Sequence, residues 1–160
     1  MEENKRIFID FDGVIYDSEK LVVERKENFS QLTWDEFFEQ LNWFDLLNEA
    51  NIINESTDYI LEAQQNERNI AILTKIHTLL EMEAKVKKIR SLGIEIPIMF
   101  VPPHVKKSEI YLPQNGEILI DDSIKNLKDW SNNGGESIYF NENLETLPEY
   151  ETVNTLKRIL

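Results

Sequence analysis

Two carboxylates, one residue apart, end a short apolar segment near the start of the chain. Asp10 and Asp12 follow the run Ile7–Ile9, and Gly13 comes next. A short apolar run that ends in this way is typical of a strand whose carboxyl end carries an acidic site. Residues two apart on a strand point to the same side, so both carboxylates can serve one site.

A second acidic pair, Asp121 and Asp122, ends another apolar run, Ile118–Ile120. In an open parallel sheet, ligands bind at the carboxyl ends of the strands. Carboxylate oxygens gathered at that edge suit a hard cation such as Mg²⁺. The two acidic pairs therefore predict an enzyme with a magnesium site.

Two further polar residues complete a set that can transfer phosphate. Thr74 ends the apolar run that begins at Ile70, and Lys107 lies in the loop after the run 98–101. A carboxylate can attack a phosphoryl group and form an aspartyl-phosphate, while Mg²⁺ reduces the repulsion between the two anions. The hydroxyl and the ammonium would neutralise the remaining phosphate oxygens. A second Asp could protonate the leaving alcohol and then deprotonate the incoming water.

The elements that must position these residues alternate along the chain. After the first strand, short apolar runs predict four more: Ile70–Thr74, Ile98–Val101, Ile118–Asp121 and Ser137–Phe140. Helical patterns separate most of them, which predicts an α/β fold of about five parallel strands with right-handed crossovers.

Two apolar stripes define helices between these strands. The first follows the capping box Thr78–Glu81 and is predicted to end at Gly93; it consists of Leu79, Met82, Val86 and Ile89. The second is ended by the segment 132–135; it consists of Ile124, Leu127 and Trp130.

Residues 17–66 interrupt this alternation. The segment contains no strand pattern, but it has a capping box at Thr33–Glu36 and a helix start near Ser56. We predict a small helical cap here, above the active edge of a core formed by 1–16 and 67–160. Its aromatic residues could stack on a nucleotide base, although their helical spacing favours a role in the core of the cap; they are Trp34, Phe37, Phe38, Trp43 and Phe44.

The composition of the chain limits the classes of molecule that it can bind. The chain has 160 residues, which suits one domain, and a net charge of −13, which opposes binding to nucleic acid or an anionic membrane. A small phosphorylated substrate remains compatible, because a bound Mg²⁺ and one Lys can reverse the local field. The absence of Cys excludes disulfides, thiolate metal sites and a Cys nucleophile. With no signal-peptide or membrane-spanning pattern, we expect a cytoplasmic protein; the oligomeric state is left open.

The order Asp10-x-Asp12-Gly13, Thr74, Lys107 and Asp121-Asp122 resembles the haloacid-dehalogenase-like (HAD) phosphohydrolases along the whole chain. This resemblance implies a Rossmann-like core with Asp10 as the nucleophile and Asp12 as the general acid/base. It also implies that Thr74 and Lys107 bind phosphate, and we add the adjacent Lys75 to this set. The implied metal site uses Asp10, Asp121, Asp122 and the backbone carbonyl of Asp12.

Within that superfamily, three segments look like the 5′(3′)-deoxyribonucleotidase group. They are Asp10–Val14 with Asp17, Val105–Ser108 and Gly116–Asp122. This chain departs from the group at Lys75, where a small hydroxyl residue is usual, and at Ser123, where Arg is common. The resemblance implies a Mg²⁺-dependent phosphomonoesterase with nucleoside monophosphates as candidate substrates. A phosphatase of a sugar phosphate or other small metabolite, and a catalytically weak binding domain, are the alternatives.

Several neighbouring residues have competing interpretations. Lys107 fits the family pattern better than Lys106, which we interpret as a surface charge. Asp121 is the stronger candidate for direct metal ligation, whereas Asp122 could act through water or cap a helix. His104 is interpreted as a loop residue, and His77 is given no role.

Overall fold

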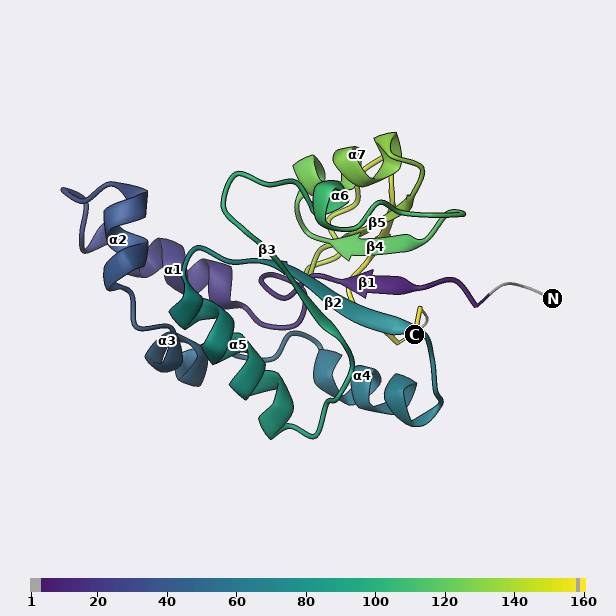
Figure 1. The fold of residues 1–160 in the computed structure, drawn as a ribbon, viewed down its shortest axis with the longest axis horizontal. Coiled ribbons are helices and arrows are strands. Elements are labelled where there is room, and N and C mark those ends of the chain that lie inside the picture. Colours follow the sequence, from purple (N-terminus) through teal and green to yellow (C-terminus); the bar gives the residue numbers. More distant parts are fainter. Residues whose placement is uncertain (1–3, 158) are drawn as a thin grey trace.

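A six-stranded parallel sheet forms the centre of the protein, seen here in a computed structural model that describes residues 4–157 and 159–160. The strand order is β3-β2-β1-β4-β5-β6 (Figure 1). Every neighbouring pair is parallel, as the alternation of strands and helices predicted. The strands are β1 (Ile7–Ile9), β2 (Ile70–Lys75), β3 (Ile98–Val101), β4 (Ile118–Asp121), β5 (Glu136–Phe140) and β6 (Glu151–Val153).

Seven helices are distributed around this sheet in the part of the chain that the structure describes. Their bounds are α1 (Ser18–Glu27), α2 (Trp34–Gln40), α3 (Trp43–Glu49), α4 (Ser56–Gln65), α5 (Leu79–Ser91), α6 (Lys107–Ile110) and α7 (Ile124–Asn132). Four of them fall between β1 and β2, in the segment where a helical cap was expected. In Figure 1, α1 to α3 lie beyond the carboxyl ends of the strands, while α4 and α5 lie on one side of the sheet and α6 and α7 on the other. The division of the chain at 17 and 66 stays a prediction. No helix among the described residues is long and apolar enough to cross a membrane.

Strand β1 sits in the middle of the sheet, in register with both neighbours. Ile9 pairs with Ile72 of β2 and with Ile120 of β4. Strand β4 continues one residue beyond this level, to Asp121, and β2 continues three, to Lys75. The carboxyl ends of all three strands nevertheless lie at one edge of the sheet, because the strands are parallel. Alternate side chains of β1 enter different apolar clusters, Ile9 on the α4 and α5 side and Phe8 on the α7 side. Both faces of the sheet are covered, which explains why its strands are short, continuous apolar runs.

The predicted apolar stripe of α5 is inward only in part: Ile89 is buried, and Met82 and Val86 are half-buried. Leu79, the first member of the predicted stripe, is 74% exposed. The buried residues of the helix are Glu81, Ala84, Lys85 and Ile89, which also repeat at helical spacing. The helix is rotated so that two charged side chains face inward, where each finds a partner of opposite charge. The stripe of α7 is also shorter than predicted, because Ile124 is exposed while Leu127 and Trp130 are buried.

The predicted helix ends are confirmed. Gly93 follows α5 with a φ of 79°, a left-handed conformation that suits glycine. Helix α7 ends at Asn132, the first residue of the predicted terminating segment. The edge strand β6 was not predicted, because its three residues show no apolar run.

Candidate active site

Three carboxylates meet where β1 and β4 end. Asp10 directly follows β1, and its backbone N–H donates to the carbonyl of Ile120 at 3.0 Å. Asp121 is the last residue of β4, and Asp122 comes next. One oxygen from each of these three side chains lies within 4.8 Å of the others. Asp10 and Asp121 are buried, and Asp122 is half-buried.

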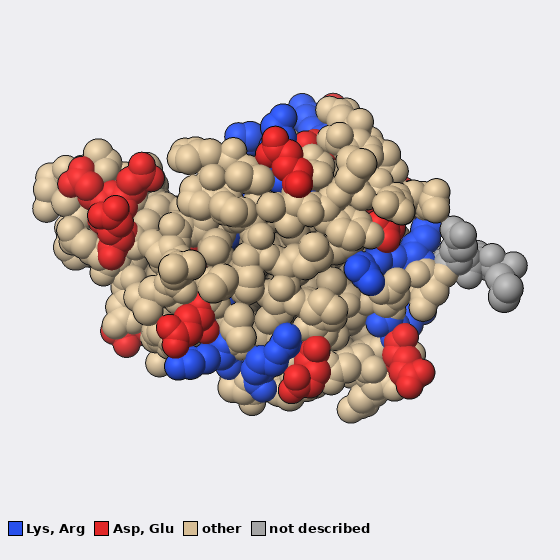
Figure 2. Space-filling model, in the orientation of Figure 1, with Lys and Arg blue, Asp and Glu red and all other residues tan. Residues whose placement is uncertain are grey.

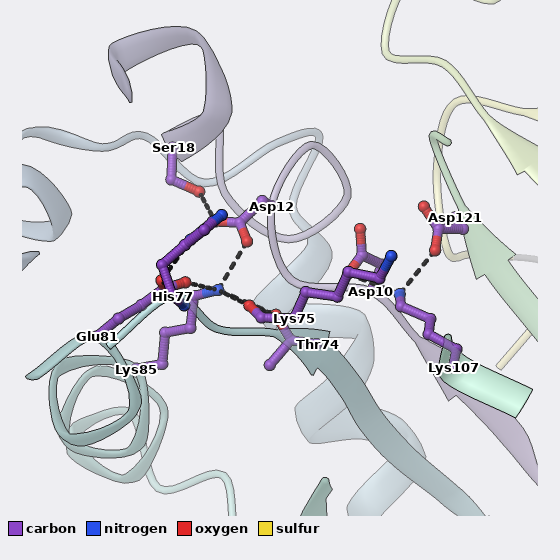
Figure 3. A network of polar contacts seen from close by, with 10 residues as sticks. All are labelled: Asp10, Asp12, Ser18, Thr74, Lys75, His77, Glu81, Lys85, Lys107 and Asp121. Atoms are coloured by element: carbon purple, nitrogen blue, oxygen red, sulfur yellow. Dashed lines mark hydrogen bonds and ion pairs between the residues drawn. The ribbon is translucent and has the colours of Figure 1, made fainter. Parts of the chain in front are cut away.

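Lys107, the first residue of α6, lies among these carboxylates. Its Nζ is 3.0 Å from Asp10 Oδ1 and 2.7 Å from Asp121 Oδ2, and Figure 3 shows it reaching in from α6. Burial alone would lower the pKa of Lys107, but the two carboxylates raise it above its ordinary value. Lys107 therefore remains a cation, and the structure brings it to the site in preference to Lys106.

One ammonium does not balance three carboxylates. Burial, with the nearby charge of Asp121, raises the pKa of Asp10 to about 8. Burial, with the charges of Asp10 and Asp121, raises the pKa of Asp122 to about 10. Asp10 and Asp122 therefore resist ionisation without a further cation. A cluster of three carboxylate oxygen donors fits Mg²⁺, which prefers such ligands.

The backbone and side chains around Asp121 and Asp122 fix their positions. Asp121 Oδ1 accepts from the backbone N–H of Ser123 at 2.9 Å, and Oδ2 accepts from Asn126 Nδ2 at 3.0 Å. Gly13 has a φ of 80°, and a Cβ at this position would overlap the Asp122 carboxylate. Glycine is thus needed here both for the backbone conformation and for the space beside Asp122.

Asp12 lines the same cavity as Asp10 but has its own cation. Its Oδ2 accepts from Lys85 Nζ at 2.7 Å, and its Oδ1 accepts from Ser18 Oγ at 2.6 Å (Figure 3). The side chain is 23% exposed, so it is held firmly yet still reaches the cavity. An acid/base needs this combination of fixed orientation and access. The metal-binding role expected of its backbone carbonyl stays a prediction.

Lys85 is a buried residue that the sequence analysis missed. Besides Asp12, its Nζ binds Glu81 Oε2 at 2.7 Å, Thr74 Oγ1 at 3.0 Å and the Lys75 carbonyl at 3.0 Å. Burial alone would lower the pKa of Lys85, but Asp12 and Glu81 raise it overall. This ammonium therefore ties the start of α5 and the end of β2 to the acid/base candidate.

The two candidate phosphate-binding residues of β2 are placed differently. Thr74 is fully buried, and its hydroxyl accepts from Lys85 and donates to the Lys75 carbonyl at 3.4 Å. Lys75 lines the cavity, and Figure 3 shows its ammonium extending toward Asp10. Burial, together with the charges of Lys107 and Lys125, lowers the pKa of Lys75. The geometry brings Lys75 to the cavity and places Thr74 behind it.

The cavity in front of the carboxylates has a volume of about 410 Å³ and one aromatic wall. The rings of Phe38 and His77 are parallel within 11° with centroids 3.6 Å apart. Trp34 stacks on Phe38 at 5.6 Å and is 48% exposed, whereas Trp43 stacks behind and is buried. Three of the cap aromatics, Trp34, Phe38 and Trp43, thus line the cavity. His77, for which the sequence analysis had no role, lines it as well.

The position of His77 is set by Glu81, one turn further along the chain. Glu81 Oε1 lies 2.8 Å from both the backbone nitrogen and the ring Nδ1 of His77. Glu81 was expected only to complete a capping box with Thr78, whose hydroxyl does accept from the Glu81 backbone at 3.2 Å. The signal that could have identified the network is the Glu81–Lys85 pair at i,i+4, next to a strand end.

No protein-family model matches the sequence, and no curated protein matches it in sequence. Solved structures do match its fold. They include a HAD hydrolase of family IA, variant 3, from Entamoeba histolytica, with 13% identity, a TM-score of 0.69 and coverage of 98% of this chain and 95% of that one.

Two other solved structures cover similar shares. The HAD hydrolase YfnB from Bacillus subtilis, solved bound to magnesium, has 15% identity, a TM-score of 0.63 and coverage of 97% and 96%. The D,D-heptose 1,7-bisphosphate phosphatase from Burkholderia thailandensis has 14% identity, a TM-score of 0.59 and coverage of 97% and 95%. The chain therefore has the Rossmann-like α/β fold of HAD hydrolases, as predicted.

Proposed function

We propose that this protein is a Mg²⁺-dependent phosphomonoester hydrolase that works through an aspartyl-phosphate on Asp10. The observation that carries this proposal is the cluster of Asp10, Asp121 and Asp122 with Lys107 bridging Asp10 and Asp121, and with Asp12 held at the same cavity. The fold that the chain shares with HAD hydrolases supports it.

In the first half of the reaction, a carboxylate oxygen of Asp10 forms a bond to phosphorus as the ester P–O bond breaks. Asp12 gives a proton to the departing alcohol oxygen. In the second half, Asp12 takes a proton from water, whose oxygen bonds to phosphorus as the aspartyl P–O bond breaks. Inorganic phosphate leaves and Asp10 is restored.

The surrounding residues position the groups that react. Lys107 fixes Asp10 relative to Asp121 and adds positive charge beside the phosphoryl oxygens, where negative charge develops. Lys85 and Ser18 hold the Asp12 carboxylate in one orientation. Mg²⁺, bound by Asp10, Asp121 and Asp122, would offset the repulsion between the nucleophile and the phosphate.

For the substrate, we infer a nucleoside monophosphate. The wall formed by Trp34, Phe38 and His77 offers an aromatic surface beside the carboxylates, on which a base can stack. A sugar phosphate is the alternative, and the fold shared with a heptose bisphosphate phosphatase favours it. The net charge of −13 supports a small molecule over nucleic acid or a membrane surface as the partner. Figure 2 shows acidic side chains gathered over α2, at the end of the molecule formed by the helices that follow β1.

The first experiment measures turnover of an aryl phosphate with and without Mg²⁺, in the wild type and in Asp10→Asn. We expect metal-dependent turnover in the wild type and loss of at least about 1,000-fold in the variant, because an amide does not form the acyl-phosphate. An Asp10→Asn variant that keeps a substantial share of the activity would contradict the nucleophile assignment. Binding without turnover would favour the alternative of a catalytically weak binding domain.

The second experiment separates nucleotides from sugar phosphates. Trp34→Ala removes an exposed aromatic surface of the cavity, and Phe29→Ala is its control, since Phe29 is also exposed but does not line the cavity. We expect Trp34→Ala to raise KM for a nucleoside monophosphate about 10-fold and to leave aryl-phosphate turnover and melting temperature near the control. Equal effects of Trp34→Ala on nucleotide and sugar phosphates would overturn the nucleotide inference.

A further inference from the structure

A second cavity adjoins the active-site cavity. Its volume is about 300 Å³, and its charged lining is Lys75, Lys106, Lys125 and Asp129, with Asn126, Asn132 and Asn133 as the polar remainder. Lys75, Lys125 and Asn126 line both cavities, which are therefore contiguous. Lys106, interpreted from the sequence as a surface charge, belongs to the second cavity alone.

The three ammonium groups of this cavity are not neutralised by the protein. Among residues 4–157 and 159–160, no carboxylate forms an ion pair with Lys75, Lys106 or Lys125. The one acid of the lining, Asp129, has both carboxylate oxygens occupied by Ser108, with Nδ2 of Asn133 also donating to one of them. The cavity is therefore cationic in a chain whose net charge is −13.

The lysines also influence one another across the boundary between the cavities. Lys75 is partly buried, and Lys125 is close enough for its charge to contribute to lowering the pKa of Lys75. Such mutual repulsion is relieved when an anion binds between the cations. A phosphate dianion has the charge and the oxygen acceptors that three lysines can bind.

We propose that the second cavity binds a second phosphate group, so that a small bisphosphate is hydrolysed in preference to the corresponding monophosphate, the nucleoside monophosphate inferred above included. This inference rests on the proposed phosphatase activity, which places the phosphate to be hydrolysed at Asp10. Lys75 and Lys125 lie along the path between the two phosphates, and Lys106 contacts the second one only. The second phosphate adds binding energy remote from the reacting bond, which the enzyme can use to raise kcat/KM.

The test compares matched substrates in the Mg²⁺-loaded protein: a nucleoside 3′,5′-bisphosphate with its 5′-monophosphate, and glucose 1,6-bisphosphate with glucose 1- and 6-phosphate. We expect at least one bisphosphate to exceed its monophosphates in kcat/KM by about 10-fold or more. Lys106→Gln should remove most of that advantage and change aryl-phosphate turnover less than about twofold. Lys128→Gln, the same charge change at an exposed position of α7 outside the cavity, is the control.

A binding measurement keeps this test separate from the proposed activity. Inorganic phosphate is titrated into the isotope-labelled protein, and the backbone amide signals are followed by NMR. We expect the amides of Asn132 and Asn133 to shift with phosphate, and Lys106→Gln to weaken that response while the response near Asp10 is kept. Absence of any shift at 132–133, or equal weakening by Lys128→Gln, overturns the second site even if phosphatase activity is present. Absence of turnover with an intact response at 132–133 overturns the proposed activity instead.

Discussion

Replacing Lys85 with Met would test whether the buried ion network at the start of α5 supports both the fold and the acid/base residue. Met has a similar length and no charge, so the substitution leaves the packing volume nearly unchanged. It removes the cation that binds Asp12 at 2.7 Å and Glu81 at 2.7 Å. Asp12, Glu81 and the Thr74 hydroxyl then lose this cation at once. Asp12 keeps the bond from Ser18, and Glu81 keeps its contact with His77.

The size of the effect follows from the exposure of each partner. Both Glu81 and Lys85 have side chains that are 0% exposed, and breaking a buried pair by removing one partner costs about 3–5 kcal/mol. Asp12 is 23% exposed, and solvent can compensate part of its lost interaction. We therefore expect Lys85→Met to lower the free energy of unfolding by about 3–4 kcal/mol at pH 7, measured by urea denaturation.

Two further variants show whether uncompensated charge is the cause. In the double variant Glu81→Gln/Lys85→Met, the buried carboxylate is gone, so it should be more stable than Lys85→Met alone. Lys87→Met is the control, because Lys87 pairs with Glu83 on the exposed side of the same helix and should cost less than about 0.5 kcal/mol. A loss below about 1 kcal/mol for Lys85→Met, or a double variant no more stable than the single one, would refute the reasoning.

The same variant should alter catalysis in a particular way. Without Lys85, Asp12 keeps only the bond from Ser18 and loses its fixed orientation. Turnover of alkyl phosphates, whose leaving group needs a proton, should then fall more than turnover of aryl phosphates. Equal losses for both classes of substrate would indicate that Lys85 has a structural role only.

The sheet and the acidic edge of the site could be predicted because they depend on local pattern. Parallel strands that are covered on both faces require continuous apolar residues, so each strand and its carboxyl end can be recognised in the sequence. The proximity of Asp10 and Asp121 was predicted from their positions at two such strand ends. Thr74 was found in the same way, but the structure places its hydroxyl behind the cavity, in contact with Lys85.

The buried pair of Glu81 and Lys85 on α5 could not be predicted, because charged residues of an amphipathic helix are expected on its exposed face. Glu81 and Lys85 are buried only because they pair with each other and because Asp12, 73 positions before Lys85, lies against them. That tertiary contact rotates the helix and exposes Leu79. The cationic cavity was missed for a related reason, since Lys75, Lys106 and Lys125 come from three separate elements.

Three further outcomes test the site. Asp12→Asn should give a burst of product with an aryl phosphate followed by slow turnover, because departure needs little protonation but hydrolysis of the aspartyl-phosphate needs a base; absence of a burst in rapid-mixing kinetics would contradict its role. Lys107→Ala should lower kcat by about 100-fold or more, since its cation lies beside the transferred phosphoryl group. A smaller loss in Lys107→Ala than in Lys106→Ala would show that Lys107 is not the lysine that binds the phosphoryl group.

The last outcome concerns the dependence of stability on pH and on Mg²⁺. Burial raises the pKa of Asp10 to about 8 and that of Asp122 to about 10, above the ordinary value of about 3.9 for an unfolded Asp. The folded metal-free protein therefore holds more protons than the unfolded chain above about pH 4, so these groups reduce stability as pH rises toward 8 and beyond. Mg²⁺ binds the ionised carboxylates and should reverse this effect. The rise in melting temperature on adding Mg²⁺ should consequently be larger at pH 8.5 than at pH 6, and an Asp122→Asn variant should show a smaller rise. A rise that is equal at both pH values, or unchanged by Asp122→Asn, would show that this carboxylate cluster does not bind the metal.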